Sequence, residues 1–415
     1  MGGTGVASAT GVDATYANPA LLSLVRANQL TIGFVGASFD LHADGPGLPG
    51  RVSTLPAKGY VVGAAVPIPF GGVLRDRIAA GLAFYAPTDT LVRASIHYPE
   101  TPEFPLLADR AQSLTMRLGV GADIGYGLRV GVGVAALANL VGAVDVGSSG
   151  GTAGSSVGEQ LIATYAPAVG LTWDLPVDRG PDDRPRWRVG ASYRGSLGAT
   201  LGVNVDASQL TTLNLPVLHI AGVAQYDPDE LAFEVAYMRD GWTVAAGVTW
   251  KHWSAYPGVF EPTIVCPAGQ PCAALTPPTI ALSNTLVPRL GAEKRWALVH
   301  RAILRLRAGV FYEPTPVPGS LASSQAYDLA SQGLVDVPTR FFDASRVVLS
   351  AGGGVDMGDH APFTVDFWAQ CHVLSSTTVQ TCTGPSGACS PDIGSGPAKL
   401  SGNVLAYGSM VGLRF

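Results

Sequence analysis

Short segments of alternating character run along this chain, and they constrain its fold more than any other feature. In residues 403–415 the bulky apolar side chains fall on one face of an extended strand: Leu405, Tyr407, Val411, Leu413 and Phe415. The opposite face holds small residues and Arg414. Because successive side chains of a strand point to opposite faces, this segment has one apolar wall and one small, polar wall. A strand that separates lipid from the lumen of a barrel shows this pattern.

Fourteen segments of this kind are expected to be strands. They cover residues 30–42, 59–66, 77–95, 112–124, 128–146, 161–173, 187–205, 217–225, 231–256, 287–294, 302–312, 346–355, 363–373 and 403–415. The links between them alternate between long and short. A soluble sandwich has no reason to alternate its links, whereas an outer-membrane barrel has short periplasmic turns and longer outside loops. The sequence therefore predicts an all-β fold, a 14-stranded antiparallel transmembrane β-barrel in the outer membrane of a Gram-negative bacterium.

The composition agrees with a membrane barrel and disfavours several other classes. The 415 residues include 52 glycines and are 47% hydrophobic, yet only 14% are charged, against about 25% in an average globular domain. The most apolar stretch, residues 130–144, is shorter than the roughly 20 residues of a spanning helix and contains Gly131 and Gly133. A net charge of -5, with no basic run beyond residues 184–188, argues against nucleic acid as a partner.

One predicted strand, residues 231–256, is longer than the others. A tilted spanning strand needs only about 9–11 residues. Arg239-Asp240-Gly241 could form a turn inside the segment, but splitting there gives an odd number of strands and breaks the alternation of links. We therefore expect one strand that continues above the membrane, with a bulge at Asp240-Gly241.

Two short motifs match enzyme signatures formally, but their contexts do not fit. GSSVG at residues 154–158 matches a nucleophile elbow, which needs a strand, a sharp turn and a helix, and here it falls in an expected Gly/Ser loop. GVGVAA at residues 131–136 resembles a dinucleotide fingerprint, but it lies inside a predicted strand with no helix after it. We therefore expect no enzyme activity, no catalytic residue, no metal and no cofactor.

All five cysteines lie in the second half of the chain: Cys266, Cys272, Cys371, Cys382 and Cys389. Two close pairs lie in Pro/Gly-rich segments typical of loops, which favours disulfides Cys266–Cys272 and Cys382–Cys389 in an oxidising compartment. Metal binding is the weaker alternative, because no His-Cys cluster has the spacing of a zinc site. Cys371 is left over and is expected to be a free thiol.

Pro87 lies in the middle of the predicted strand at residues 77–95. Proline has no N–H to donate, so it is normally confined to sheet edges or bulges. A closed barrel has no edges. Pro87 is therefore expected to break the ladder locally and to open a gap between lumen and lipid, unless the strand has already left the bilayer at that point.

The loop after this strand, residues 97–110, is apolar for an exposed segment. It contains Tyr98, Phe104, Leu106 and Leu107 among acidic residues and prolines. Exposed apolar side chains gain nothing unless they pack or bind. Packing within the loop and capture of an apolar ligand at the surface are the two interpretations.

Residues 1–28 differ from the rest of the chain, because small and polar residues lead into Asn18-Pro19-Ala20 before the first predicted strand. The opening MGGTGVASATGVDATYANPALLSL resembles the plug of the FadL-type outer-membrane transporters of long-chain fatty acids and other hydrophobic compounds, which ends in an Asn-Pro-Ala motif. FYAPTDTL resembles the kinked third strand of that family. Further blocks resemble the family in the same order: YPETPEFPLLADRAQSL, TTLNLPVL, VTWKHWSAYPGVF, VPRLGAEKRW and GVFYEPTPVPGS.

The resemblance implies a plug or hatch at residues 1–28 inside a barrel at residues 29–415. It implies passive transport, with ligand capture by outside loops, an internal apolar pocket and a plug-controlled exit through the wall. The implied plug residues are Asp13, Asn18, Pro19 and Ala20. The implied residues of the lateral opening are Phe84, Tyr85, Pro87 and Asp89. The implied partners are a hydrophobic small molecule, either a fatty acid or a hydrocarbon, and outer-membrane lipid or lipopolysaccharide around a monomer.

Several points stay open at this level. No signal peptide is visible at Met1, and family members carry further mature residues before this point, so the sequence is expected to be a mature form or to lack its true start. Arg93, Arg117 and Arg194 are available to hold a carboxylate, but no local motif selects them, and the substrate could equally be uncharged. A general diffusion porin and a loop-based adhesion or structural barrel are the alternatives.

Overall fold

The computed structural model describes most of the chain. It covers residues 1–88, 100–108, 114–149, 152–178, 186–206, 217–258, 264–266, 273–274, 280–298, 301–328, 333–358, 361–382 and 396–415.

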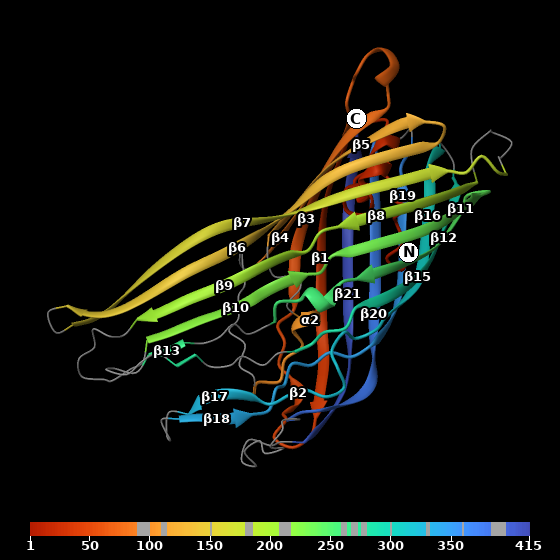
Figure 1. Cartoon of the computed structure of the whole chain (residues 1–415). Coiled ribbons are helices and arrows are strands. Elements are labelled where there is room, and N and C mark those ends of the chain that lie inside the picture. The colour runs from red at the N-terminus through yellow and green to blue at the C-terminus, as the bar shows by residue number, and fades with distance from the viewer. Residues whose placement is uncertain are drawn as a thin grey trace.

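Fourteen antiparallel strands form a closed barrel (Figure 1). In order around the ring they are β1 (Gln29–Asp44), β3 (Ala57–Pro67), β4 (Ile78–Pro87), β5 (Thr115–Gly125), β6 (Leu128–Ser149), β7 (Thr152–Asp174), β8 (Trp187–Arg194), β11 (Glu230–Arg239), β12 (Trp242–Lys251), β15 (Thr285–Ala297), β16 (Ile303–Glu313), β19 (Arg346–Asp356), β20 (Phe363–Gln380) and β21 (Pro397–Arg414). β1 pairs with β21 from Gln29↔Arg414 to Asp44↔Lys399, which closes the ring. The predicted 14-stranded barrel is confirmed.

Smaller elements extend the barrel strands, lie at the ends of the barrel or precede its first strand in the sequence. The short strands and extensions are β2 (Gly50–Val52), β9 (Leu197–Asp206), β10 (Val217–Asp227), β13 (Ile264–Cys266), β14 (Ala273–Ala274), β17 (Ser324–Asp328) and β18 (Gly333–Val337). The helices are α1 (Asp13–Ala17), α2 (Pro105–Ala108) and the 3-10 turns η1 (Pro19–Leu24), η2 (Gly72–Leu74) and η3 (Trp253–Ala255). None of the helices in the described part of the chain is long and apolar enough to cross a membrane.

The strand count is right, but two of its boundaries are wrong. Asp240 and Gly241 form the hairpin turn between β11 and β12, with φ of 49° and 77°, so the predicted single strand with a bulge at residues 231–256 is incorrect. Conversely, β10 and β11 follow one another across Pro228-Asp229, where a link between two wall strands was predicted. The two errors cancel in the total of fourteen.

Two further predicted boundaries shift. The expected loop at residues 147–160 is largely strand, because β6 runs to Ser149 and β7 begins at Thr152. GSSVG therefore lies within β7 rather than in a loop, and no helix follows it. The ends of β6, β7, β9 and β10 project beyond the barrel (Figure 1).

The outer face of the barrel is apolar. The bulky side chains predicted to face lipid on the last strand are exposed: Leu405, Tyr407, Val411, Leu413 and Phe415. Ile32, Tyr60, Val132 and Phe367 are exposed on other strands. A continuous apolar outer surface on a closed barrel is the surface that hydrocarbon chains of a bilayer would cover.

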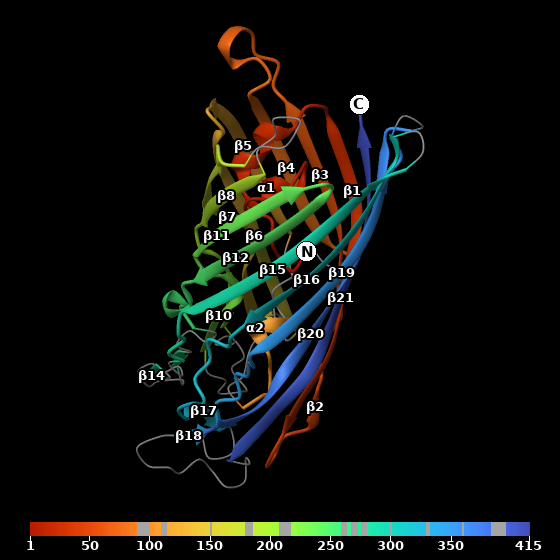
Figure 2. The same cartoon turned by 90° about the vertical axis from the view of Figure 1, so that its right-hand side faces the viewer.

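The two ends of the barrel differ. The C-terminus, the start of β1 and the short turns, such as Gly125-Tyr126-Gly127, lie at one end, here named the turn end (Figure 2). At the other end, the loop end, the connections are longer and enclose the largest apolar core, which includes Phe104, Trp253 and Phe342. The rings of Phe104 and Phe342 lie 6.0 Å apart. The predicted alternation of long and short links holds only in part, because the expected long link at residues 147–160 is largely strand.

Candidate functional site

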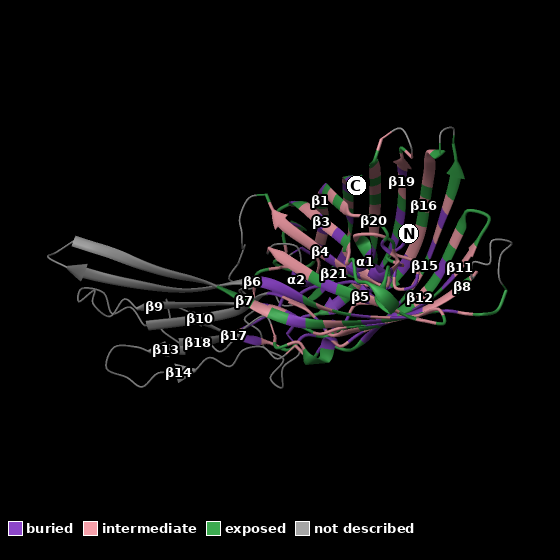
Figure 3. Ribbon diagram, turned by 90° about the horizontal axis from the view of Figure 1, so that it is seen from above, coloured by how far each residue is buried: buried purple, intermediate pink, exposed green. Residues whose placement is uncertain are grey.

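The N-terminal segment lies inside the ring of strands. α1 and the N-terminus are surrounded by the barrel in the view from above (Figure 3). Two parts of the segment that contact the wall are named here the arm, residues 1–8, and the anchor, residues 18–25. The first barrel strand begins shortly after the anchor, at Gln29.

Inward-facing glycines make room for this segment. A Cβ added to any of them would collide with the segment: Gly63, Gly81, Gly121, Gly131, Gly170, Gly190, Gly291 and Gly309. They come from eight different strands, and several face each other across the ladder, as in Gly121↔Gly131 and Gly131↔Gly170. Glycine permits a backbone to approach another backbone closely because it has no Cβ. The wall is therefore shaped to accept the segment.

Asn18 fixes the anchor to the wall. Its Nδ2 donates to Val6 O at 2.7 Å and to the strand carbonyls of Leu171 and Ala191 at 3.2 Å each. Its Oδ1 accepts from Ala20 N at 3.1 Å and so caps η1, with Pro19 at the first position of the turn. Asn18 is fully buried. Asparagine is the side chain that can donate to several carbonyls and accept a capping bond at once.

The rest of the anchor is held by apolar burial. Leu21, Leu22 and Val25 pack with Ala65 of β3 and Ala79 of β4 in one buried cluster. Ser23 Oγ donates to Ala20 O at 2.7 Å, which satisfies its hydroxyl inside this cluster. Burial of one leucine side chain contributes about 1.5–3 kcal/mol.

The arm is held mainly by one carboxylate. Glu234 of β11 accepts hydrogen bonds from Gly5 N at 2.6 Å, Val6 N at 3.0 Å, Ala7 N at 3.1 Å and Ser8 Oγ at 2.7 Å. Its side chain is buried.

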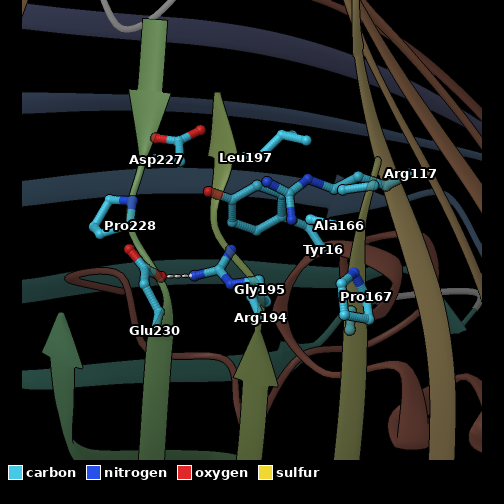
Figure 4. Close-up of a pocket in the computed structure, with 12 residues that line it drawn as sticks. Tyr16, Arg117, Ala166, Pro167, Arg194, Gly195, Leu197, Asp227, Pro228 and Glu230 are labelled. Atoms are coloured by element: carbon cyan, nitrogen blue, oxygen red, sulfur yellow. Dashed lines mark hydrogen bonds and ion pairs between the residues drawn. The ribbon is translucent and has the colours of Figure 1, made fainter. Parts of the chain in front are cut away.

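A cavity lies beside Tyr16 of α1 (Figure 4). Its volume is about 40 Å³, and it continues into open solvent. Much of its wall is small and apolar: Ala135, Ala166, Pro167, Ala168, Gly195 and Leu197. The Tyr16 ring lies between two guanidinium groups, 4.3 Å from that of Arg117 and 4.8 Å from that of Arg194. Such cation–π contacts hold the ring in position.

The two arginines differ in their charge partners. Arg194 forms an ion pair with Glu230. Within the described part of the chain, Arg117 contacts no acidic side chain at ion-pair distance. Two of the three arginines proposed for a carboxylate therefore lie at one cavity, while Arg93 lies outside the described residues.

A chain of charges continues from this cavity across the barrel toward the loop end. Lys251 contacts both Glu230, at 3.8 Å, and Glu313. Arg346 contacts Glu313 at 2.7 Å and Asp343 at 3.3 Å. Burial of Asp343 in the loop before β19 raises the pKa of its carboxyl, and the charge of Arg346 opposes this shift. Buried charges need partners of this kind, so the chain links β8, β11, β12, β16 and β19.

Pro87 lies at the end of β4. β4 ends at Pro87, which pairs with Gly59 of β3, and Thr88 N donates to Lys58 O at 3.0 Å. On the other side, the pairing of β4 with β5 stops at Tyr85↔Thr115 in the described residues. Phe84 and Tyr85 are half-buried within β4, whereas Asp89 lies outside the described residues. The role of these residues as an opening stays a prediction.

The apolar loop residues lie within the loop-end core. Phe104 and Leu106 are buried there, Leu107 packs against it, and Tyr98 is outside the described residues. This placement favours packing within the loop over capture at the surface for Phe104 and Leu106.

The remaining predicted site residues are placed as follows. Asp13 begins α1 and is exposed. Pro19 and Ala20 are buried in η1. Cys371 is a free, exposed thiol. Cys382 is disulfide-bonded, but Cys389 and Cys272 lie outside the described residues, so both pairings stay predictions. No group of three His, Cys, Asp or Glu side chains in the described ranges could hold a metal ion.

Sequence reasoning missed Glu234, Tyr16 and the inward glycines. Glycines at alternate positions of the predicted strands were a usable signal, because alternate residues share one face. Nothing in the sequence near Glu234 marks it, since its partners are backbone groups more than two hundred residues away.

Comparison with known proteins agrees with this geometry. No family model matches the chain. Alkane uptake protein A of Marinobacter nauticus is 24% identical over 320 residues, which cover 74% of this chain and 68% of that protein. The crystal structure of a Pseudomonas aeruginosa FadL homologue superposes with a TM-score of 0.63 at 14% identity, covering 100% of this chain and 96% of that chain. The chain has the fold of the FadL-type outer-membrane β-barrels.

Other solved structures share the FadL-type fold. The toluene transporter TodX of Pseudomonas putida has a TM-score of 0.57 at 15% identity and covers 100% of this chain and 97% of its own. Two of these proteins are named for the uptake of alkanes and the transport of toluene. In an outer-membrane barrel of this type the short turns face the periplasm and the long loops face outside, so the turn end is periplasmic and the loop end extracellular.

Proposed function

We propose that this FadL-type barrel is a passive uptake channel for hydrophobic compounds. The observation that carries the proposal is a closed barrel whose inner wall has glycines where the N-terminal segment lies. An open porin needs no such fitted segment, which speaks against general diffusion of polar solutes. The names of the relatives, an alkane uptake protein and a toluene transporter, agree with an apolar cargo.

In this proposal residues 1–28 are the plug and residues 29–415 are the barrel. Cargo enters from the extracellular loops and reaches the cavity beside Tyr16. The small apolar wall there suits a hydrocarbon chain or ring, and binding sites for such ligands are mostly apolar with a few placed polar groups. Arg117, which contacts no acidic side chain in the described residues, would hold the carboxylate of a fatty acid if the cargo has one.

Cargo then leaves sideways beside Pro87. The described pairing of β4 with β5 ends before Pro87, and proline donates no hydrogen bond that could continue the ladder. A lateral exit delivers an apolar molecule to lipid without a step through water. The barrel acts as a monomer surrounded by lipid and lipopolysaccharide.

A test of this route replaces Pro87 by a strand former. Purified protein in proteoliposomes is compared with the Pro87→Val variant for uptake of labelled hexadecane, toluene and oleate. Pro288→Val is the matched control, because Pro288 also pairs within the wall, in β15 opposite Val248. We expect a several-fold loss of uptake in Pro87→Val and none in Pro288→Val.

The two possible failures are separable. If wild-type proteoliposomes take up none of the three compounds faster than empty liposomes, the uptake function is wrong. If wild type takes them up and Pro87→Val does so equally well, only the lateral exit is wrong. The ratio of oleate to hexadecane uptake reports whether the cargo carries a charged head group.

A further inference from the structure

We propose that Glu234 is the latch of the plug: its carboxylate holds the arm closed, and the arm opens by releasing Glu234 while the anchor stays in place. The inference rests on the proposed function, because a plug that controls the passage of cargo must have a part that moves. It assigns that part to residues 1–8.

The carboxylate of Glu234 is placed to accept hydrogen bonds from the backbone N–H groups of the arm. Three consecutive amides, of Gly5, Val6 and Ala7, and the Ser8 hydroxyl all donate to the one carboxylate at 2.6–3.1 Å. Hydrogen bonds to an ionised group are roughly twice as strong as those between neutral groups. No lysine, arginine or histidine in the described ranges lies at ion-pair distance from Glu234, so the arm itself supplies the groups that stabilise this buried charge.

The neighbouring strands are shaped to admit the arm at this point. Glu234 pairs with Gly190 of β8 on one side and with Gly247 of β12 on the other. A Cβ on Gly190 would stand 2.5 Å from Val6 O and 3.1 Å from Ala7 Cα. Gly190, the β8 neighbour of Glu234, therefore leaves the space that the backbone of Val6 and Ala7 occupies.

The other polar contacts of the arm are single and dispersed. Gly2 N donates to Ser350 Oγ at 2.7 Å, and Arg289 Nη1 donates to Gly3 O at 3.2 Å. Arg188 reaches Ala7 O only at 3.5 Å. Glu234 thus concentrates four bonds on one side chain, and its release frees most of the arm together.

The anchor does not depend on Glu234. Asn18 bonds to strand carbonyls of Leu171 and Ala191, and Leu21 and Leu22 are fully buried. One hydrogen bond, from Asn18 Nδ2 to Val6 O, joins anchor and arm. Loss of the latch is therefore expected to loosen residues 1–8 and leave residues 18–25 unchanged.

Hydrogen–deuterium exchange of the full chain in lipid nanodiscs tests the assignment. In Glu234→Gln one acceptor oxygen is replaced by an NH₂ group that faces the arm donors, and in Glu234→Ala all four bonds are lost. We expect exchange of the amides of residues 5–8 to rise by about tenfold or more in both variants, the factor that corresponds to 1.4 kcal/mol. Exchange in residues 20–25 should stay as in wild type.

Ser350→Ala is the matched control, since it removes a single bond to the same arm, at Gly2. It should leave exchange at residues 5–8 near the wild-type rate. Heat-modified migration on gels establishes that each barrel is folded, and Glu234→Asp, which keeps the charge, should show an intermediate rate. The proposal is overturned if residues 5–8 exchange at the wild-type rate in Glu234→Ala, or if arm and anchor accelerate equally.

Uptake separates this proposal from the one on which it rests. A wild-type protein that transports no apolar compound contradicts the channel function, whatever the exchange rates are. A transporting wild type whose arm is insensitive to Glu234 contradicts the latch alone.

Discussion

The arm and the anchor of the plug both lie against inward-facing glycines, but different forces hold them. The anchor buries Leu21 and Leu22 and is capped by Asn18, whose amide also bonds to two strand carbonyls. The arm fully buries one small apolar side chain, Ala7, beside a partly buried Met1, and most of its polar bonds to the wall converge on Glu234.

This difference assigns separate roles to two parts of one segment. Water in a lumen can replace hydrogen bonds to the arm at small net cost, since the net contribution of an intramolecular hydrogen bond is only about 0.5–1.5 kcal/mol. Water cannot replace the burial of two leucines. Segments with few buried apolar contacts open locally at the lowest free-energy cost. The arm is therefore the part suited to move, and the anchor is the part suited to stay.

The largest expected contrast comes from adding one methyl group to the wall under each part. A Cβ at Gly131 would collide with the backbone of Pro19 and Ala20, and a Cβ at Gly309 would collide with the backbone of Met1 and Gly2. We expect Gly131→Ala to lower the free energy of unfolding by about 3 kcal/mol, because the anchor cannot move away. Gly309→Ala should lower it by less than about 1 kcal/mol, because the arm can move away.

Urea unfolding of the folded barrel in detergent measures both values. Gly319→Ala serves as control, because no atom lies within 4 Å of a Cβ built there. Equal losses for Gly131→Ala and Gly309→Ala would remove the distinction between arm and anchor.

A smaller effect is expected from changing the chemistry of Asn18. Asn18→Asp keeps the acceptor for Ala20 N but replaces the NH₂ donor by an oxygen that faces the carbonyls of Val6, Leu171 and Ala191. We expect a loss of about 2 kcal/mol in unfolding free energy, in the range for a buried polar group without a partner. Asn18→Ala should cost less than Asn18→Asp, because it introduces no repulsion. The same unfolding experiment ranks the two variants, and the opposite order would contradict the bonding described for Asn18.

The fold followed from the sequence to a large extent, because alternation of side chains and links is a local signal. The number of strands was right although Asp240-Gly241 was taken for a bulge. Asp-Gly is the dipeptide that a two-residue hairpin turn prefers, since both residues need a positive φ. The length of the segment favoured a turn at Asp240-Gly241. The even strand number disfavoured it only because a second turn was wrongly expected at Pro228-Asp229.

The site was less predictable, because its contacts join distant parts of the chain. Asn18-Pro19-Ala20 stands out in the sequence since a capping residue before proline marks the start of a helical turn. Glu234 and Arg117 look like any other lumen-facing charge until the plug is placed beside them. The glycines opposite the plug form no motif within any one strand. Their common role, contact with the plug, is seen only when the strands are assembled around it.

The most direct measurement of the central claim fixes each part of the plug in turn and follows uptake. Ala7 and Ala236 share one buried cluster, and Leu22 and Ala79 share another, so paired cysteines in a Cys371→Ser background provide an arm lock and an anchor lock. Mass spectrometry confirms each disulfide, and wild type with reductant controls for the native disulfide at Cys382. We predict that the arm lock abolishes uptake of an apolar cargo until reductant is added, while the anchor lock transports like wild type. Transport by the oxidised arm lock, or its loss in the anchor lock, would contradict the account.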